Sequence, residues 1–509
     1  MIERNWLDRL VSFMSPSAGA KRTKSRFKEQ LLLGQSRKFE GASVGRRTAG
    51  WQTTSSSANT ELLGAISTLR NRSRDLVRND PYASRAMQLI ASNVVGAGIV
   101  PQARNKSVKR VAIANQQWKA WGEKTLCDYD GNKNFYGIQA LAMRTIAESG
   151  EVLIRKIISK DGGPVPLQIQ ILEPDYLATQ QTSLGMEKDG SYIIQGVEFD
   201  KNGKRVAYWL YDRHPGDMSF RASGLIPKRV LASEVIHAYV QNRPGQVRGY
   251  PFAAPIVIKL RDLNEYDDAQ LIRQKIAACY AAFVYDSEDA SDLTTNDDNQ
   301  LIDKFEPGMI ERLPPGKDVK FGTPPTVDGY AEFNRTVLRG IAAGFGVPYE
   351  ALTGDLSQVN FSSGRMGWLE FQRNIDMWRW QTLIPMMCDR VWQWFTELST
   401  LNGSDIMGID VAWTAPRREM IDPTREVAAT RDAIRSGLQT VSDAIRQNGE
   451  DPLEHFKEYK SDNDLIDKLG LVLDCDPRKT SSGGQSQAAF NGAADNSSPN
   501  DTGANGGNG

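Results

Sequence analysis

The sequence predicts a mixed α+β chain that is predominantly helical and carries disordered segments at both ends. Amphipathic runs with helix-capping residues recur over most of its 509 residues, as in helices packed on a core. Residues 151–240 instead contain short apolar runs separated by turn residues, a pattern typical of strands. The last residues, 481–509, are rich in Gly, Ser and Asn with one aromatic side chain, so they cannot bury enough surface to fold.

The first third of the chain is predicted as a basic arm followed by helices. The first 50 residues hold 11 Lys and Arg against four Asp and Glu, and we expect residues 1–58 to be largely mobile. A helix is predicted from about residue 61 to residue 79, and Asp80-Pro81 starts the next with an N-cap and a first-turn proline. Two more helices are predicted over residues 108–121 and 136–149, the second ended by Gly150.

The strand-rich stretch predicts antiparallel pairing. Asn202-Gly203 is a strong signal for a tight hairpin between two of its strands. The predicted strands cover residues 151–159, 167–172, 192–199, 206–211 and 235–240.

Two helices flank an acidic segment in the middle of the chain. The first is predicted from Phe252 to about Val284, with small residues at its end. The second covers residues 330–346, with Val337, Ile341 and Phe345 on one stripe and Gly340, Ala343 and Gly344 beside it. Residues 286–328 between them hold 11 Asp and Glu against four Lys and Arg, and predict a small module of short elements.

An exposed polar loop over residues 351–365 is predicted to lead into a long helix. Two apolar stripes follow it, from Trp368 to Trp378 and from Ile384 to Leu398, and they are out of phase. Pro385 lies at the break and predicts a kink. Residues 422–460 predict short helices that start at Asp422-Pro423 and Asp451-Pro452.

The sequence lacks the motifs of common catalytic sites. No GxxxxGK[ST], GxSxG or HExxH occurs. None of the three histidines has a metal-ligand partner at helical or hairpin spacing, and His237 lies in an apolar run typical of a core histidine. We therefore predict no enzymatic activity, no metal and no cofactor. No signal peptide or membrane span is predicted either, and four scattered cysteines without a CxxC pair fit a reducing compartment.

Four stretches, in this order along the chain, resemble the lambda-type portal proteins of tailed bacteriophages. They cover residues 70–81 with 93–101, residues 243–251, residues 339–355 with 360–365, and residues 421–451. The second stretch carries the motif residues Arg243, Pro244, Gly245, Gln246, Arg248 and Gly249.

The resemblance implies a ring, usually of twelve subunits, with wing, stem, clip and crown regions. Transferred to this chain, residues 1–58 are the arm and 59–251 the wing. Residues 252–284 and 330–350 are the two stem helices, on either side of a clip over 285–329. A tunnel loop over 351–365 precedes a long kinked helix and the return to the wing over 366–421. The crown covers 422–470, and 471–509 is a disordered tail.

The implied function is a non-enzymatic channel at one capsid vertex, through which DNA is packaged and ejected. Implied partners are further copies of the chain, double-stranded DNA bound without sequence preference, a terminase, a capsid or scaffold protein, and a head-completion or adaptor protein. The ring would be assembled in the host cytoplasm, would then lie at the portal vertex of the virion, and would not contact a membrane. The channel-facing polar residues of the tunnel loop would be Asp355, Ser357, Gln358, Asn360, Ser362 and Ser363.

Two other functions stay open at this point. A metal-dependent DNA-processing enzyme could use the plentiful carboxylates and the basic arm. A minor head protein could lack a channel altogether. For the loop itself, the alternative is an ordinary mobile surface loop.

Overall fold

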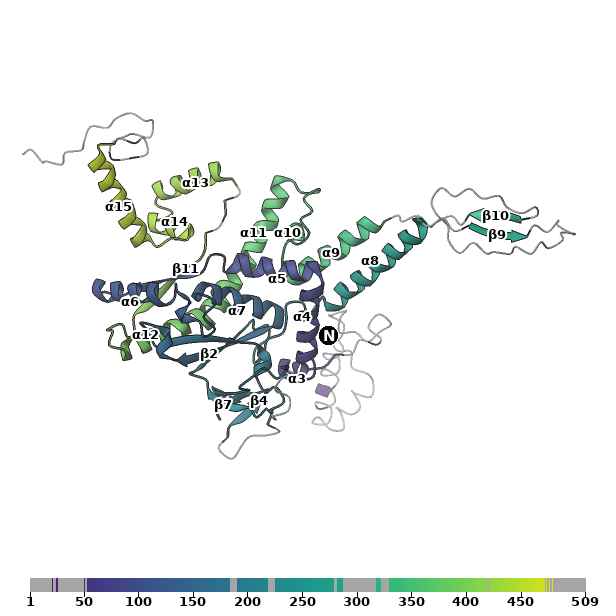
Figure 1. Cartoon of the computed structure of the whole chain (residues 1–509), viewed down its shortest axis with the longest axis horizontal. Helices are drawn as coiled ribbons and strands as arrows, with labels where there is room; N and C mark the ends of the chain where they lie inside the picture. The colour runs from purple at the N-terminus through teal and green to yellow at the C-terminus, as the bar shows by residue number, and fades with distance from the viewer. Residues whose placement is uncertain are drawn as a thin grey trace, which may run out of the picture. The chain divides into compact units, whose positions relative to one another are not determined.

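A computed structural model describes residues 53–183, 190–217, 225–278, 282–286, 317–321, 329–417, 419–420 and 422–471, with a few isolated positions besides (Figure 1). Two units divide the chain, Met1–Thr60 and Glu61–Gly509, and the second holds nearly all described elements. The predicted mobile arm and disordered tail therefore lie almost wholly outside the described residues. No described helix is long and apolar enough to cross a membrane.

The helices of the N-terminal third form largely where capping residues predicted them. They are α3 (Ala58–Leu63), α4 (Ile66–Asn79), α5 (Pro81–Val94), α6 (Val108–Trp121) and α7 (Phe135–Ser149). The Asp80 side chain accepts a hydrogen bond from the Ala83 amide at 2.7 Å, and Pro81 occupies the first turn of α5, as predicted. Gly150 ends α7 in the left-handed region, at φ 94°. The single helix predicted over 61–79 is wrong, because α3 and α4 are separate.

A three-stranded antiparallel sheet lies against these helices. Its order is β3 (Leu167–Leu172), β2 (Glu151–Ile158), β8 (Val235–Tyr239), close to the predicted bounds. α7 contacts β2, and the long C-terminal helix contacts β8. Val152 and Ile154 pack in the core cluster of these helices, whereas Leu153, on the opposite face, packs in a second cluster with Val197 and Tyr208. Both faces of the central strand are therefore buried.

A second, four-stranded sheet has the order β4 (Tyr192–Ile194), β5 (Val197–Phe199), β6 (Arg205–Leu210), β7 (Lys228–Leu231). The single strand predicted over 192–199 is wrong: Gln195 and Gly196 both have positive φ, 48° and 84°, and fold it into a tight hairpin. The hairpin predicted at Asn202-Gly203 joins β5 to β6 and is confirmed. β7 was not predicted.

The helix predicted to end near Val284 stops earlier. α8 (Val257–Ala278) is followed by β9 (Ala282–Asp286), which pairs antiparallel with β10 (Lys317–Phe321). α9 (Tyr330–Phe345) then follows with nearly the predicted bounds. The rest of the acidic module over 286–328 lies outside the described residues.

One continuous helical stretch dominates the C-terminal half. α10 (Tyr349–Thr353) precedes α11 (Phe361–Met377), the π-helical segment η6 (Trp378–Cys388) and α12 (Asp389–Leu401). The irregularity predicted at Pro385 takes the form of this π-helical segment, whose i→i+5 bonding accommodates a residue without an amide hydrogen. Both predicted stripes are largely buried, for example at Phe371 and Ile375 before it and at Met387 and Val391 after it.

The remaining elements close the core and form a C-terminal module. β1 (Val100–Arg104) pairs with β11 (Asp410–Thr414), a pairing across about 300 residues that was not predicted. α13 (Pro423–Arg435), α14 (Val441–Gln447) and α15 (Pro452–Leu469) follow, and Asp422 and Asp451 cap their helices as expected. Among the described residues there are also three single-turn helices, η2 (Thr125–Cys127), η3 (Lys160–Gly162) and η4 (Pro174–Tyr176).

Candidate functional site

α8 and α9 lie side by side and are joined by polar contacts as well as aromatic ones (Figure 1). Asp267 Oδ1 accepts hydrogen bonds from Tyr330 Oη at 2.9 Å and from Asn334 Nδ2 at 3.0 Å. The ring of Tyr266 lies 4.6 Å from that of Phe333, between centroids. These contacts fix the register of the two helices on either side of the β9–β10 pair.

Two glycines on α9 allow the base of α8 to approach closely. A Cβ at Gly344 would clash with Ile256 Cγ2, and a Cβ at Gly340 would clash with Lys259 Nζ. Ile256 is buried and rigid, whereas the lysine amine is the end of a flexible chain. Of the small residues predicted beside the α9 stripe, Gly340 and Gly344 therefore pack this helix pair, most strictly Gly344, whereas Ala343 is exposed.

The exposed loop predicted over 351–365 is shorter in the structure. Only residues 354–360 lie between α10 and α11. Asn360 is the N-cap of α11 and forms a capping box with Ser363: the Ser363 amide donates to Asn360 Oδ1 at 2.8 Å. Ser362 lies exposed in the first helical turn. Of the six predicted tunnel-loop residues, Asn360, Ser362 and Ser363 thus belong to the start of a helix.

Asp355 is held by the loop itself. Its carboxylate accepts hydrogen bonds from Ser357 Oγ at 2.6 Å and from Tyr349 Oη at 2.9 Å, and Arg335 Nε lies 3.7 Å away. The hydrogen bonds from Ser357 and Tyr349, together with the charge of Arg335, lower the pKa of Asp355 to about 2. Asp355 therefore shapes the loop, while Ser357 and Gln358 at its tip are exposed.

The motif over residues 243–249 forms a buried ionic network. Arg248 and Glu151 are fully buried, and Arg248 Nε donates to both carboxylate oxygens at 2.9 and 3.0 Å. Arg248 Nη1 also donates to the Gln195 carbonyl at 2.9 Å. Arg70, from the first family-like stretch, adds a second ion pair to Glu151 at 3.0 Å. Two of the four stretches thus meet at one carboxylate.

The other motif residues shape the turn that carries Arg248. Gln246 Oε1 accepts from the amides of Asn242 and Arg243, and Gln246 Nε2 donates to the Arg248 carbonyl at 2.7 Å. Gly245 has φ 76°, and a Cβ at Gly249 would clash with the Gly150 carbonyl oxygen. Pro244 and Arg243 are exposed, and Arg243 pairs with Glu61 at 2.8 Å.

The pKa values of the groups in this network depend on burial and on the neighbouring charged side chains. Burial by itself raises the pKa of Glu151, but the charge of Arg248 and the hydrogen bond from His237 outweigh this and hold that pKa well below its ordinary value. His237 Nε2 lies 2.9 Å from Glu151 Oε2, and burial lowers the pKa of His237 to about 4. The prediction that His237 is a core histidine is confirmed.

One group of side chains has the composition of a metal site. Ligand atoms of Glu173, Asp175 and His214 lie within 4.8 Å of one another, the only such group among the described residues. Both carboxylates already pair with Arg74, at 2.9 and 2.7 Å, and Asp175 also pairs with Arg70. The charge of this group is therefore taken up by arginines, and it carries no metal assignment.

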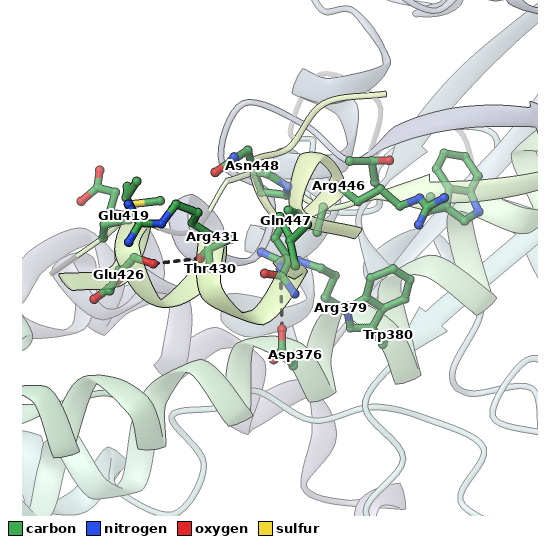
Figure 2. A pocket seen from close by; sticks show the side chains of 18 of the residues that line it. Asp376, Arg379, Trp380, Glu419, Glu426, Thr430, Arg431, Arg446, Gln447 and Asn448 are labelled. Carbon is green, nitrogen blue, oxygen red and sulfur yellow. Dashed lines mark hydrogen bonds and ion pairs between the residues drawn. The ribbon is translucent and has the colours of Figure 1, made fainter. Parts of the chain in front are cut away.

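A groove that sequence analysis missed lies between the long helix and the C-terminal module (Figure 2). Its volume is about 770 Å³. Asp376, Arg379 and Trp380 face residues of α13 and α14 across it, as Figure 2 shows. Trp380 is about half exposed, and no pattern in the sequence marks this groove.

Comparisons with known proteins place the chain beside phage portal proteins. A family model described as "Phage portal protein, lambda family" matches residues 44–379. The probable portal protein of Halomonas phage phiHAP-1 is 27% identical over 481 residues, covering 90% of each chain. Portal protein B of Escherichia phage lambda is 23% identical over 478 residues, covering 82% of this chain and 87% of that one. A solved chain from the neck of a native GTA particle is 16% identical with a TM-score of 0.44, covering 74% of this chain and 93% of that one.

The family model covers well over half of the sequence, so the chain belongs to the lambda family of phage portal proteins. It is a structural protein of the virion that assembles as an oligomeric ring at the portal vertex of the capsid. The resemblance inferred from four short stretches is confirmed.

Proposed function

We propose that twelve copies of this chain form the ring, and that the ring is a passage for double-stranded DNA during packaging and ejection. The observation that carries the proposal is the α8–α9 pair, packed through Gly340 and Gly344 and followed, after the short helix α10, by the loop over 354–360. In this assignment α8 and α9 are the stem, the segment between them is the clip, residues 59–251 are the wing, and 422–470 are the crown.

The charge distribution supports a passage that does not hold its cargo. Duplex DNA carries about one negative charge per 1.7 Å of its axis, so a ring of exposed lysines would bind it. The exposed tip of the loop instead carries Ser357 and Gln358, while Asp355 is occupied by its own hydrogen bonds. The acidic composition of residues 286–328 likewise favours repulsion of DNA near the clip.

We also propose that the chain is not an enzyme. Partner proteins would supply the force for DNA packaging and would complete the head after filling. A terminase would dock on the clip during filling, and head-completion or adaptor proteins would replace it. The basic arm over 1–58 would contact scaffold, capsid or packaged DNA, and assembly would take place in the host cytoplasm. Incubation of the purified ring with DNA and Mg²⁺ tests the first point, since strand cleavage would favour the DNA-processing enzyme.

The ring itself is tested by native mass. Twelve copies of the 56.5 kDa chain give about 680 kDa. A particle of this mass with a central hole in negative-stain images is the expected result. A stable monomer, or a closed assembly without a hole, would contradict the proposed function.

The passage is tested at the loop tip. Gln358→Lys adds one exposed positive charge per subunit, and we expect DNA packaging in extracts to slow several-fold because each lysine attracts phosphate. Gln358→Ser is the matched control and should package at the wild-type rate. Unchanged packaging and DNA retention in the lysine variant would show that this loop does not face DNA.

A further inference from the structure

We propose that the groove between the long helix and α13–α14 receives α15 of the neighbouring copy in the ring. This inference rests on the ring of the proposed function and names the two surfaces that meet. A closed ring of identical subunits needs a heterologous interface, in which one patch of each copy meets a different patch of the next. The C-terminal module offers two such patches.

The first patch is the groove. Its walls carry Trp380 from η6 and the stripe of Val427 and Ile434 on α13. Val427 and Trp380 are each about half exposed, and α13 buries no residue within its own chain. A helix of 13 residues without a buried side chain is marginal alone, so its apolar stripe needs a partner.

The rim of the groove on the side of the C-terminal module carries three arginines beside two glutamates, Glu419 and Glu426. Arg431 and Arg435 from α13 and Arg446 from α14 line it (Figure 2 labels the first and the last). Among the residues that the structure describes, Arg431 and Arg446 form ion pairs only with close sequence neighbours, Asp432 and Asp443. Such exposed local pairs contribute little, so these cations can accept other carboxylates at small cost.

The second patch is one face of α15. Glu458, Asp462, Leu465 and Leu469 follow the spacing i, i+4, i+7, i+11, which places them on one side of a helix. Leu465 and Leu469 are each more than half exposed, and both acids are exposed. Within the described part of the chain, neither acid has an ion pair. α15 is an 18-residue helix that buries only Pro452.

The two patches are complementary and lie apart on the same subunit. α15 contacts its own α14, and Figure 1 shows α15 on one side of the α13–α14 pair and α11 on the other. One copy therefore cannot fill its groove with this face of its own α15. In the ring, Leu465 and Leu469 of one copy would pack on Trp380, Val427 and Ile434 of the next. Glu458 and Asp462 would meet the arginines of the rim.

Charge exchange in the full-length ring tests the pairing. One variant carries Glu458→Arg and Asp462→Arg, a second carries Arg431→Glu and Arg435→Glu, and a third carries all four changes. We expect each double variant to raise the unassembled fraction about tenfold or more by like-charge contact, and the fourfold variant to restore the ring. Lys109→Glu with Glu123→Lys, on exposed positions outside both patches, is the control and should assemble normally.

Rings that form normally in both double variants would overturn the inference, and so would a fourfold variant that stays unassembled although circular dichroism shows it folded. A second measurement does not depend on folding of charge variants. Ile434→Cys with Leu465→Cys should give a ladder of disulfide-linked multimers on oxidation, and either cysteine alone should not. If the double-cysteine variant formed rings like the wild type but gave only monomer on the denaturing gel after oxidation, the pairing would also be refuted. Failure of the wild-type chain to form any ring would instead refute the proposed function.

Discussion

The carboxylate of Glu151 pairs with two buried arginines, so its removal should be the most damaging conservative change within residues 59–251. Glu151→Gln keeps the size of the side chain but leaves Arg248 buried without a counter-charge and Arg70 with Asp175 alone; the two arginine side chains are 0% and 2% exposed. Removal of one partner from a buried ion pair costs about 3–5 kcal/mol, because the other charge stays desolvated. For a region of this size, that corresponds to a fall in Tm on the order of 10 °C.

Differential scanning fluorimetry of the purified chain measures this effect. Glu61→Gln is the matched control, because it removes the surface pair with Arg243 of the same motif, where both side chains are 49% exposed. That change should cost less than about 1 kcal/mol. If Glu151→Gln melted within about 2 °C of wild type, the buried network would not stabilise the fold as argued.

Three further outcomes follow from contacts described above. His237 has a folded pKa of about 4 against an ordinary 6.5, so the unfolded state takes up its proton first and stability falls as pH drops from about 6.5 to about 4. This contribution is about 3 kcal/mol at most, and His237→Gln should flatten the pH dependence of Tm over that window; an unchanged slope would contradict the assignment. Gly344→Ala should destabilise the α8–α9 pair by about 1–3 kcal/mol through its clash with Ile256, whereas Gly367→Ala on α11, with open space around it, should be neutral or mildly stabilising in the same melting assay. Equal effects of the two changes would rule out close helix packing at Gly344. Asp355→Ala should speed proteolytic cleavage within residues 354–360 without shifting global Tm, while Asp217→Ala should not affect cleavage there; wild-type cleavage rates in Asp355→Ala would show that Asp355 does not hold the loop.

Local signals in the sequence predicted helix ends well. Asp80, Asp422 and Asp451 each cap a helix with a side-chain hydrogen bond to an amide two or three residues ahead, an interaction that depends only on neighbouring residues. The Asn202-Gly203 turn is equally local. These elements could therefore be predicted without knowledge of the rest of the fold.

Elements that depend on distant partners could not. The alanine-rich end of α8 favours helix, yet residues 282–286 pair with a strand more than 30 residues ahead. β1 contains Pro101, which disfavours a strand, and only its pairing with the distant strand β11 shows that it is one. The hairpin at Gln195-Gly196 uses a glutamine with positive φ, which turn statistics do not favour.

The site shows the same division. Family-like stretches identified Arg248 and Arg70 as important, but their common partner Glu151 is about 80 and 100 residues away and carries no motif. The loop after α10 was predicted, but not its contraction to 354–360, because the Asn360 capping box resembles an ordinary polar run. The groove beside Trp380 depends on segments 40 to 70 residues apart and has no sequence pattern.

The π-helical segment η6 gives the long helix a fixed rotational offset. At its start, Trp378 lies against Phe252 and near Gly346; after it, Trp394 Nε1 donates to the Ser233 carbonyl beside the sheet. Each residue of a helix turns its successors by about 100°, so a one-residue deletion within Trp378–Cys388 would swing all of α12 away from the sheet while leaving α11 in place. The length of this segment is consequently more constrained than its composition: it should tolerate many side-chain exchanges but no insertion or deletion.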